Sequence, residues 1–191
     1  MWLWPLVYSQ VTDPFQLLGL PRTYSLDRRE LDEKHKKRSL ELHPDRLRGR
    51  SPVERRQALS LAIEVNQAYR TLRDPAARAL SLASLLGLTV GGEESRSADP
   101  AFLMQMMELR EELTALRSKK DRSGVERQIQ RARAEARQAE EALGRAFEKE
   151  KLDAAEIEGW IGKLRYWARF LEEAELISDD LEVSDHAPRH L

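Results

Sequence analysis

The sequence contains no cysteine, which excludes disulfides, thiolate metal sites and cysteine nucleophiles. Glycine and proline are scarce, at 9 and 8 of 191 residues, and no segment alternates apolar and polar residues between turn signals. We therefore expect no β-strands. The net charge is only −1, so the overall charge gives no indication of a nucleic-acid partner.

A long apolar run is also absent. Residues 1–8 are mostly apolar, but they are too few to cross a bilayer and lack the basic start and small-residue cleavage site of a signal peptide. The expectation is a cytoplasmic protein with no membrane partner. Trp2 and Trp4, in an N-terminal extension over residues 1–12, could pack on the rest of the protein, or the true start could lie downstream of them.

Charged residues make up 34 % of the chain and hydrophobic residues 41 %, with Glu, Arg, Leu and Ala abundant. This composition favours helices, and we predict an all-α protein with two helical modules. The predicted divisions are an N-terminal module over 13–74, a short helix and linker over 75–98, a helical bundle over 99–177 and a disordered tail over 178–191.

Helix-capping signals divide the first module into three helices. Asp13-Pro14 opens a short helix that ends at Gly19, and a densely charged second helix starts around residues 25–27 and runs to Leu42. Ser51-Pro52-Val53-Glu54 is a capping box that opens a third helix, ending near Arg73. One apolar stripe on the third helix predicts antiparallel packing against the second. That stripe comprises Ala58, Ala62, Val65, Tyr69 and Leu72.

The loop between these two helices begins with His43-Pro44-Asp45. Proline disfavours helix at the residue before it, so the second helix should end here. Because Pro44 restricts the backbone, His43 and Asp45 would be presented without an ordering cost when a partner docks. Asp45 suits a charge-assisted bond to an arginine, and His43 offers hydrogen-bonding ring nitrogens.

Three further helices are predicted in the second module, over residues 100–119, 125–151 and 154–176, with a break at Asp121 to Gly124. Each has one apolar face, and short connections indicate an antiparallel three-helix bundle. The first of these helices has more apolar width than such a bundle needs, because Leu103, Met104 and Met107 lie beside its core positions. This surplus suggests a partner site. The predicted core positions are Phe102, Met106, Leu109 and Leu113.

Together with the loop, several framing motifs make the first module resemble a J-domain: Asp13-Pro14-Phe15, Leu17 to Leu20, and IEVNQAYRTL at 63–72 before Asp74-Pro75. The resemblance implies that the module binds a DnaK-type chaperone and stimulates its ATPase. The basic second helix would steer the protein toward an acidic surface, an effect that salt weakens. The residues implied in chaperone binding are His43, Pro44, Asp45, Arg28, Lys34, Lys37 and Arg38.

The second helix departs from the J-domain pattern, because His35 stands where an aromatic core residue is usual and Arg38 where a leucine is usual. Two arrangements are compatible with this. The helix could be rotated so that Leu40 turns inward, or His35 and Arg38 could lie at the edge of the packed face with their stems buried.

The second module, with FLMQMMELREEL at 102–113 and KLRY at 163–166, resembles the C-terminal bundle of the HscB co-chaperones of the bacterial type. That resemblance implies a role in iron–sulfur cluster assembly, in which the bundle binds the scaffold protein IscU and delivers it to the chaperone HscA or DnaK. It implies neither a metal nor a cofactor in the chain itself. The implied scaffold-binding residues are Leu103, Met104, Met107, Glu108, Glu111 and Tyr166.

Other functions have weaker support. In an enzyme, His43 and Asp45 would act as an acid–base pair, but no nucleophile, phosphate loop or metal cluster accompanies them. The bundle could instead be a spacer or self-association element, although the alanine-rich helix over 125–151 argues against stable dimerisation, so a monomer is expected. For a nucleic-acid role the basic helix lacks an aromatic platform. His186 and His190 have no partner acid at ligand spacing.

Overall fold

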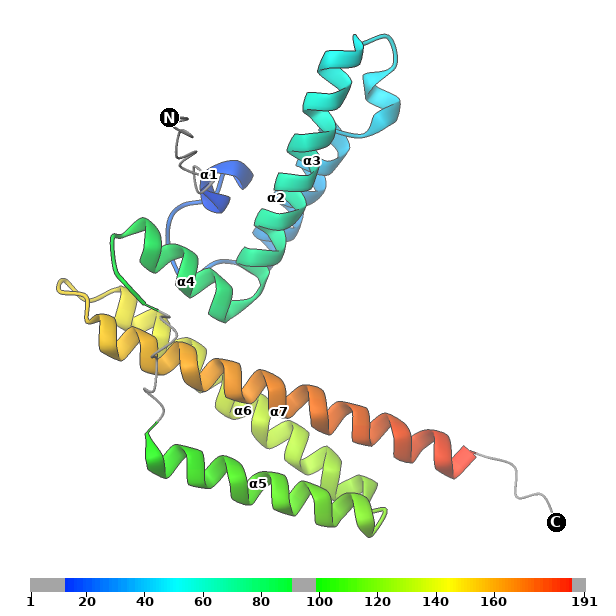
Figure 1. The fold of residues 1–191 in the computed structure, drawn as a ribbon, viewed down its shortest axis with the longest axis vertical. Helices are drawn as coiled ribbons and strands as arrows, with labels where there is room; N and C mark the ends of the chain where they lie inside the picture. Colours follow the sequence, from blue (N-terminus) through cyan, green and yellow to red (C-terminus); the bar gives the residue numbers. More distant parts are fainter. Residues whose placement is uncertain (1–12, 91–98, 187–191) are drawn as a thin grey trace, which may run out of the picture. The chain divides into compact units, whose positions relative to one another are not determined.

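The computed structural model of the protein describes residues 13–90 and 99–186, the last three of them without side chains. Every regular element in these ranges is a helix, and the described chain contains no strand. The helices form two compact units, residues 1–85 and 86–191 (Figure 1). The predicted all-α class is confirmed. Three predicted parts lie wholly or partly outside the described residues: the extension over 1–12, residues 91–98 of the linker and residues 187–191 of the tail.

The first unit begins with the short helix α1, which has the predicted capping at both ends. The Oδ1 atom of Asp13 accepts hydrogen bonds from the backbone of Phe15 and Gln16. Gly19 ends the helix in the left-handed conformation, with φ of 66°, which glycine adopts without a steric penalty. The helices of this unit are α1 (Pro14–Leu18), α2 (Arg28–Glu41), α3 (Pro52–Arg73) and α4 (Pro75–Leu85).

Helices α2 and α3 lie side by side as a hairpin, and α1 packs against α3 near the base of that hairpin (Figure 1). The core of the unit is located at this base. Residues 36–64, which we call the distal arm, contain no fully buried residue. The hairpin therefore extends the loop between α2 and α3 well beyond the core that supports it. The main buried side chains are Phe15, Leu18, Leu31, Val65 and Leu72.

Of the two arrangements considered for α2, the first is absent and the second holds for His35 but not for Arg38. Leu40 is 53 % exposed, so the helix is not rotated to bring it inward. His35 is half-buried at the edge of the packed face and stacks on Tyr69, whereas Arg38 is exposed and pairs with Glu41 at 3.3 Å. A histidine can replace an aromatic core residue here because Tyr69 covers one face of its ring while its ring nitrogens can still form hydrogen bonds.

The capping box at the start of α3 is present as predicted. Ser51 Oγ accepts a bond from the Glu54 backbone at 3.3 Å, and the Ser51 backbone donates to Glu54 Oε2 at 2.8 Å. Hydrogen bonding of the carboxylate by the Ser51 backbone and then by the Ser51 hydroxyl, with help from Arg50 at 3.1 Å, holds the pKa of the Glu54 carboxyl below its ordinary value of 4.5. The carboxylate therefore stabilises the folded turn above pH 4.5, and this contribution is lost as pH falls through the lowered pKa.

We expect the Ser51 amide proton to report this titration in NMR spectra, with a midpoint below 4.5. A Glu54→Gln variant should abolish the midpoint, because its amide does not titrate in this range, while keeping an acceptor for the Ser51 amide. A Ser51 amide that shifts with a midpoint at or above 4.5, or one that still titrates in the variant, would contradict the capping-box assignment.

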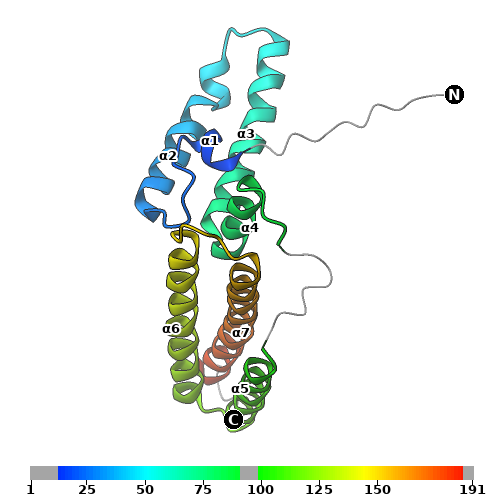
Figure 2. The same cartoon turned by 90° about the vertical axis from the view of Figure 1, so that its left-hand side faces the viewer.

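The second unit is a three-helix bundle in which α6 and α7 lie side by side along most of their length (Figure 2). Its core includes Trp167 and Phe170, whose rings meet edge to face at 6.1 Å. The predicted core positions of the first helix are confirmed, since Phe102, Met106, Leu109 and Leu113 are all buried. The helices are α5 (Pro100–Ser118), α6 (Arg122–Phe147) and α7 (Ala154–His186).

Four arginine–carboxylate pairs run along α7 and define the directions of the helices. Arg110 of α5 pairs with Glu173, and Arg117 of α5 pairs with Asp180. A step of seven residues along α5 thus corresponds to a step of seven residues in the same direction along α7, so the two helices run parallel. In the two pairs between α6 and α7, the residue number rises along α6 while it falls along α7. Helix α6 is therefore antiparallel to both α5 and α7, as predicted. Each pair is exposed and contributes at most about 1 kcal/mol. The α6 pairs are Arg133–Glu175 and Arg122–Glu182.

Three predicted boundaries in this unit are wrong, one of them because α6 ends at Phe147 and not near residue 151. The tail was expected from residue 178, but α7 continues to His186, because Ile177 and Leu181 are buried in the bundle and Asp180 pairs with Arg117. The break at 121–124 is also shorter than predicted. Asp121 caps α6 by accepting a bond from the Gly124 backbone at 2.9 Å, which places 122–124 in the first helical turn.

Candidate functional site

The His43-Pro44-Asp45 loop is at the end of the α2–α3 hairpin, in an exposed position. Pro44 begins a 3-10 turn, η1 (Pro44–Leu47), and His43 has the extended backbone of a cap. The side chains of His43 and Asp45 are 56 % and 67 % exposed. Both are therefore accessible to a partner, which the predicted role of this loop requires.

Local hydrogen bonds hold the loop in one conformation. Nδ1 of His43 accepts a bond from the Asp45 backbone at 3.3 Å. In the neutral ring this assigns the proton to Nε2, which can then donate to a partner. Arg48 binds Oδ1 of Asp45 at 3.0 Å, while Oδ2 accepts no hydrogen bond from the described residues. The loop therefore presents one donor, at His43, and one free carboxylate oxygen, at Asp45.

The predicted basic residues of α2 do not all lie together. Lys34, Lys37 and Arg38 fall within about one helical turn on the half of α2 nearer the loop. Arg28 is the first residue of α2, about 15 Å along the helix axis from Arg38. Lys37, Arg38 and Arg28 are exposed and Lys34 is half-buried. Three of the four can therefore contribute to one positive surface beside the loop.

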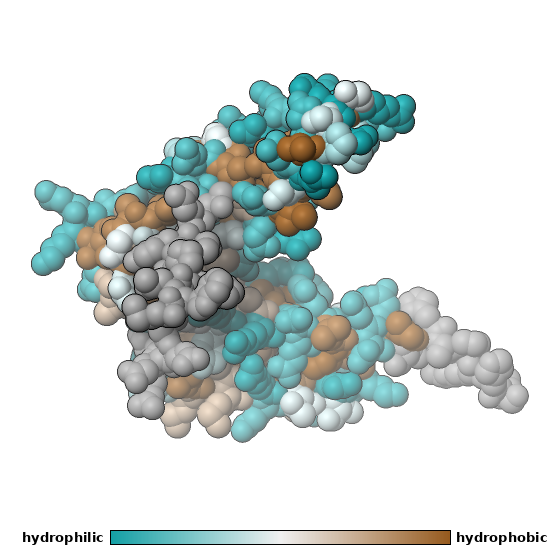
Figure 3. Space-filling model, turned by 45° about the horizontal axis from the view of Figure 1, so that its top comes forward, coloured by the Kyte–Doolittle hydropathy of each residue, from teal (hydrophilic) through white to brown (hydrophobic). Residues whose placement is uncertain are grey.

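Further basic residues surround the loop, and the sequence interpretation missed them. Between residues 34 and 56 the chain has nine lysines and arginines against three acidic residues. The end of the hairpin is accordingly covered mainly by hydrophilic side chains (Figure 3). The run RLRGRSPVERR at 46–56 was a visible signal for this charge. Besides Lys36, which belongs to the basic second helix, the additional cations are Arg46, Arg48, Arg50, Arg55 and Arg56, all exposed.

The second candidate site is the outer face of α5. Met104 and Met107 are 67 % and 64 % exposed, although both are large apolar side chains. Leu103 beside them is half-buried, and Glu108 and Glu111 are exposed one turn further along the same face. Two neighbouring exposed methionines with acidic neighbours are an adaptable apolar surface rather than part of the core.

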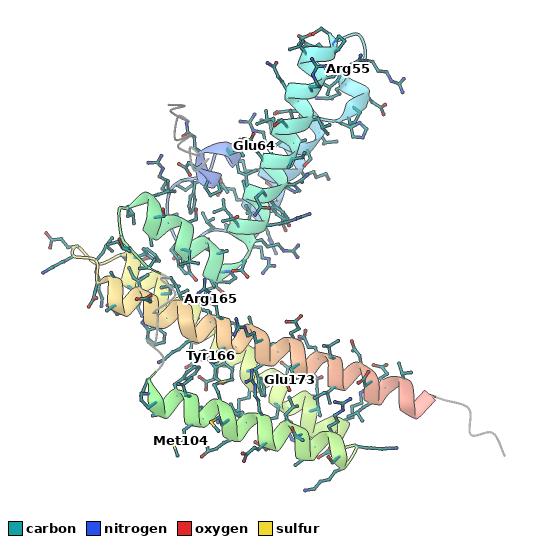
Figure 4. The ribbon with its side chains drawn as sticks, in the orientation of Figure 1. Arg55, Glu64, Met104, Arg165, Tyr166 and Glu173 are labelled. Atoms are coloured by element: carbon teal, nitrogen blue, oxygen red, sulfur yellow. The ribbon has the colours of Figure 1, made fainter. Side chains whose placement is uncertain are left out.

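Tyr166 differs from the other predicted scaffold-binding residues. It is half-buried on α7 and meets Phe102 of α5 edge to face at 5.7 Å. Figure 4 shows Tyr166 on the side of α7 that faces α5, whereas Met104 points away from the bundle. Tyr166 therefore helps to hold α5 in place in addition to any contact it makes with a partner.

The described residues contain no cluster of three or more His, Asp or Glu side chains placed to hold a metal ion. His43 and Asp45 approach only to 3.7 Å, and their side chains are open to solvent. Among the described helices, none is long and apolar enough to cross a membrane.

Comparison with known families matches both units. Residues 13–80 match the model of the DnaJ domain, and residues 98–175 match the model of the HscB C-terminal oligomerisation domain. The sequence is 37 % identical over 163 residues to a protein of Cupriavidus taiwanensis named co-chaperone protein HscB homolog. That alignment covers 85 % of this chain and 89 % of the relative.

A second relative, co-chaperone protein HscB of Proteus mirabilis, is 42 % identical over 101 residues, which span 53 % of this chain and 58 % of that protein. Among solved structures, chaperone HscB from Vibrio cholerae matches with a TM-score of 0.77 and 30 % identity, over 88 % of this chain and 99 % of that one. Human co-chaperone HscB matches with a TM-score of 0.76 and 26 % identity, over 87 % and 82 %. The chain therefore belongs to the HscB family of J-domain co-chaperones.

Proposed function

We propose that this protein stimulates the ATPase of a DnaK- or HscA-type chaperone through His43, Pro44 and Asp45. The exposure of these residues at the end of a basic hairpin is the observation that carries the proposal. Bonds within the loop hold the His43 Nε2 proton and the free Asp45 oxygen in place relative to each other, so docking needs little ordering of the loop itself. The chain itself would not hydrolyse ATP.

Positive charge around the loop supports an acidic docking surface on the chaperone. Lys34, Lys37 and Arg38 lie on the half of α2 nearer the loop, and the arginines of 46–56 surround the loop itself. Such charges accelerate association more than they tighten the complex, and salt screens them over about 8 Å at physiological ionic strength. Arg28, at the far end of α2, would contribute least to this attraction.

We further propose that the bundle binds an IscU-type iron–sulfur scaffold and delivers it to the chaperone, in support of iron–sulfur protein maturation. The proposed contact is the outer face of α5, where Met104 and Met107 expose apolar surface next to Glu108 and Glu111. Leu103 and Tyr166 would extend it toward α7. The cluster would travel on the scaffold and not on this chain.

The cytoplasm is the proposed compartment, and a monomer the proposed state. A chain without cysteine neither needs nor uses an oxidising environment. The alanines Ala132, Ala139 and Ala146 of α6 are buried within this unit, so they offer no surface to a second copy.

The experiment that tests the proposal is steady-state ATP turnover by purified DnaK- and HscA-type chaperones. We expect this protein alone to show no turnover, to raise the turnover of one chaperone, and to raise it further when IscU is present. The higher turnover with IscU should depend on this protein. No stimulation of either chaperone would refute the proposed role of the loop, and stimulation unaffected by IscU would refute the role of the bundle.

A further inference from the structure

A cluster of polar and aromatic side chains joins α2 to α3 where the core of the first unit ends. His35 and Tyr69 stack with ring centroids 4.0 Å apart and an angle of 13° between their planes. Nε2 of His35 lies 2.9 Å from Oδ1 of Asn66, to which it donates in the Nε2-protonated tautomer. The Tyr69 hydroxyl donates to Oδ1 of Asp32 at 2.8 Å. We call Asp32, His35, Asn66 and Tyr69 the aromatic clamp.

The aromatic clamp lies at the base of the distal arm, between that arm and the core of the first unit. The distal arm, residues 36–64, contains no fully buried residue, so little apolar burial orients it. The apolar side chains there, such as Leu42, Ala58 and Ala62, are at most half-buried. Segments with few buried contacts open locally at low free-energy cost. The contacts at the base of the arm must therefore contribute much of its orientation.

Arg73 and Asp32 both interact with Tyr69 of the aromatic clamp. The guanidinium of Arg73 lies 5.7 Å from the Tyr69 ring centroid, on a helical position one turn after it. The bond to Asp32 favours the protonated phenol, which raises the pKa of Tyr69 above its ordinary value of 10.0. Tyr69 is thus bound through its ring and its hydroxyl, and His35 through its ring and its edge.

We propose that the aromatic clamp positions the His43-Pro44-Asp45 loop by setting how α2 and α3 are held together at the base of the distal arm. His35 and Tyr69 are positioning residues in this proposal, and they need not touch the chaperone. The inference rests on the proposed function only for its effect on ATP turnover. Its effect on the arm itself can be measured in the free protein.

The first test is amide hydrogen exchange in the free full-length protein. His35→Ala removes the ring stack and the bond to Asn66, so we expect the protected amides of the distal arm to exchange about threefold to tenfold faster, the range that one aromatic contact supplies. His35→Phe keeps a stacking ring and should restore most of the protection. Leu40→Ala, an exposed position on the same helix, is the control and should change nothing. Unchanged exchange in His35→Ala overturns the proposal.

A double-mutant cycle separates positioning from direct contact with the chaperone. His35→Ala and Tyr69→Leu should each raise the concentration needed for half-maximal ATPase stimulation by about threefold to tenfold. The double variant should be little worse than either single variant, because both disrupt the same stack. His35→Phe should return this concentration toward the wild-type value, with the maximal rate unchanged throughout.

Additive effects in the cycle would overturn the proposal, since residues that contact the chaperone separately would behave that way. So would failure of His35→Phe to rescue. If the wild-type protein stimulates no chaperone, the proposed function fails, but the exchange measurements still decide whether the aromatic clamp orders the arm.

Discussion

Replacing His43 with glutamine, or Asp45 with asparagine, is expected to abolish stimulation of the partner ATPase while the helical content and melting temperature stay near wild type. Both side chains are more than half exposed and contribute nothing to a core. Removing one partner of a charge-assisted bond at a docked interface costs about 2 to 5 kcal/mol, or at least roughly thirty-fold in affinity. Titrating each variant against ATP turnover measures the loss.

The structure offers a control for this experiment within the same loop. Arg50 pairs with Glu54 at 3.1 Å and contacts neither His43 nor Asp45. Arg50→Gln should therefore keep the maximal stimulation but need a somewhat higher protein concentration at low salt to reach it, because it removes one of the positive charges that accelerate association. Unfolding of the His43 or Asp45 variants, or full stimulation by them, would refute the assignment of the loop.

Arg48 already binds the carboxylate of Asp45 in the free protein. Its bond to Oδ1 of Asp45 is intramolecular, so a chaperone arginine must share the carboxylate with it or displace it. The carboxylate has a free oxygen and can accept more than one donor. Arg48 therefore helps to orient Asp45 in the free protein, which is the state that a chaperone would encounter.

The second large effect is expected on the outer face of α5. Met104→Glu combined with Met107→Glu should weaken binding of an IscU-type scaffold by at least roughly a hundred-fold, because burying each methionine contributes about 1.5 to 3 kcal/mol. The new charges would also stand beside Glu108 and Glu111 and raise the desolvation cost. Calorimetry or a pull-down with purified scaffold would measure the change.

These two positions are better probes than Tyr166. Tyr166 packs against Phe102, so Tyr166→Ala would loosen the bundle and weaken binding for two reasons at once. Met104 and Met107 are about two-thirds exposed, so their replacement leaves the core intact. Leu176→Glu, at another exposed apolar position of the same unit, is the matched control and should leave binding unchanged. Equal loss in the control would show that the effect is not specific to α5.

His43→Gln and the double variant of Met104 and Met107 should each affect only one of the two proposed activities. The loop belongs to residues 1–85 and the α5 face to residues 86–191, each with its own core. Scaffold binding should therefore survive His43→Gln, and stimulation in the absence of scaffold should survive the double methionine variant. Loss of both activities in either variant would contradict the assignment of the two activities to separate units.

The sequence by itself determined the features that depend on neighbours in the chain. Asp13 caps α1 and Ser51 caps α3 through bonds to residues two or three positions away, so both were predicted correctly. The core side of α5 followed from helical periodicity, because Phe102, Met106 and Leu109 recur on one face. The loop was recognisable because its three residues are adjacent and lie between two helical patterns.

Only the tertiary structure decided features that depend on distant partners. Ser178 and the acidic residues after it predicted a disordered tail, yet Leu181 packs in the bundle and Asp180 pairs with Arg117, 63 positions away in the chain. His35 likewise matched two possible arrangements until its stack on Tyr69, on another helix, was known. A local pattern specifies which residues can be helical, but burial and pairing depend on which other helix lies against them, and the hydrophobic energy of that contact is much larger than local propensity.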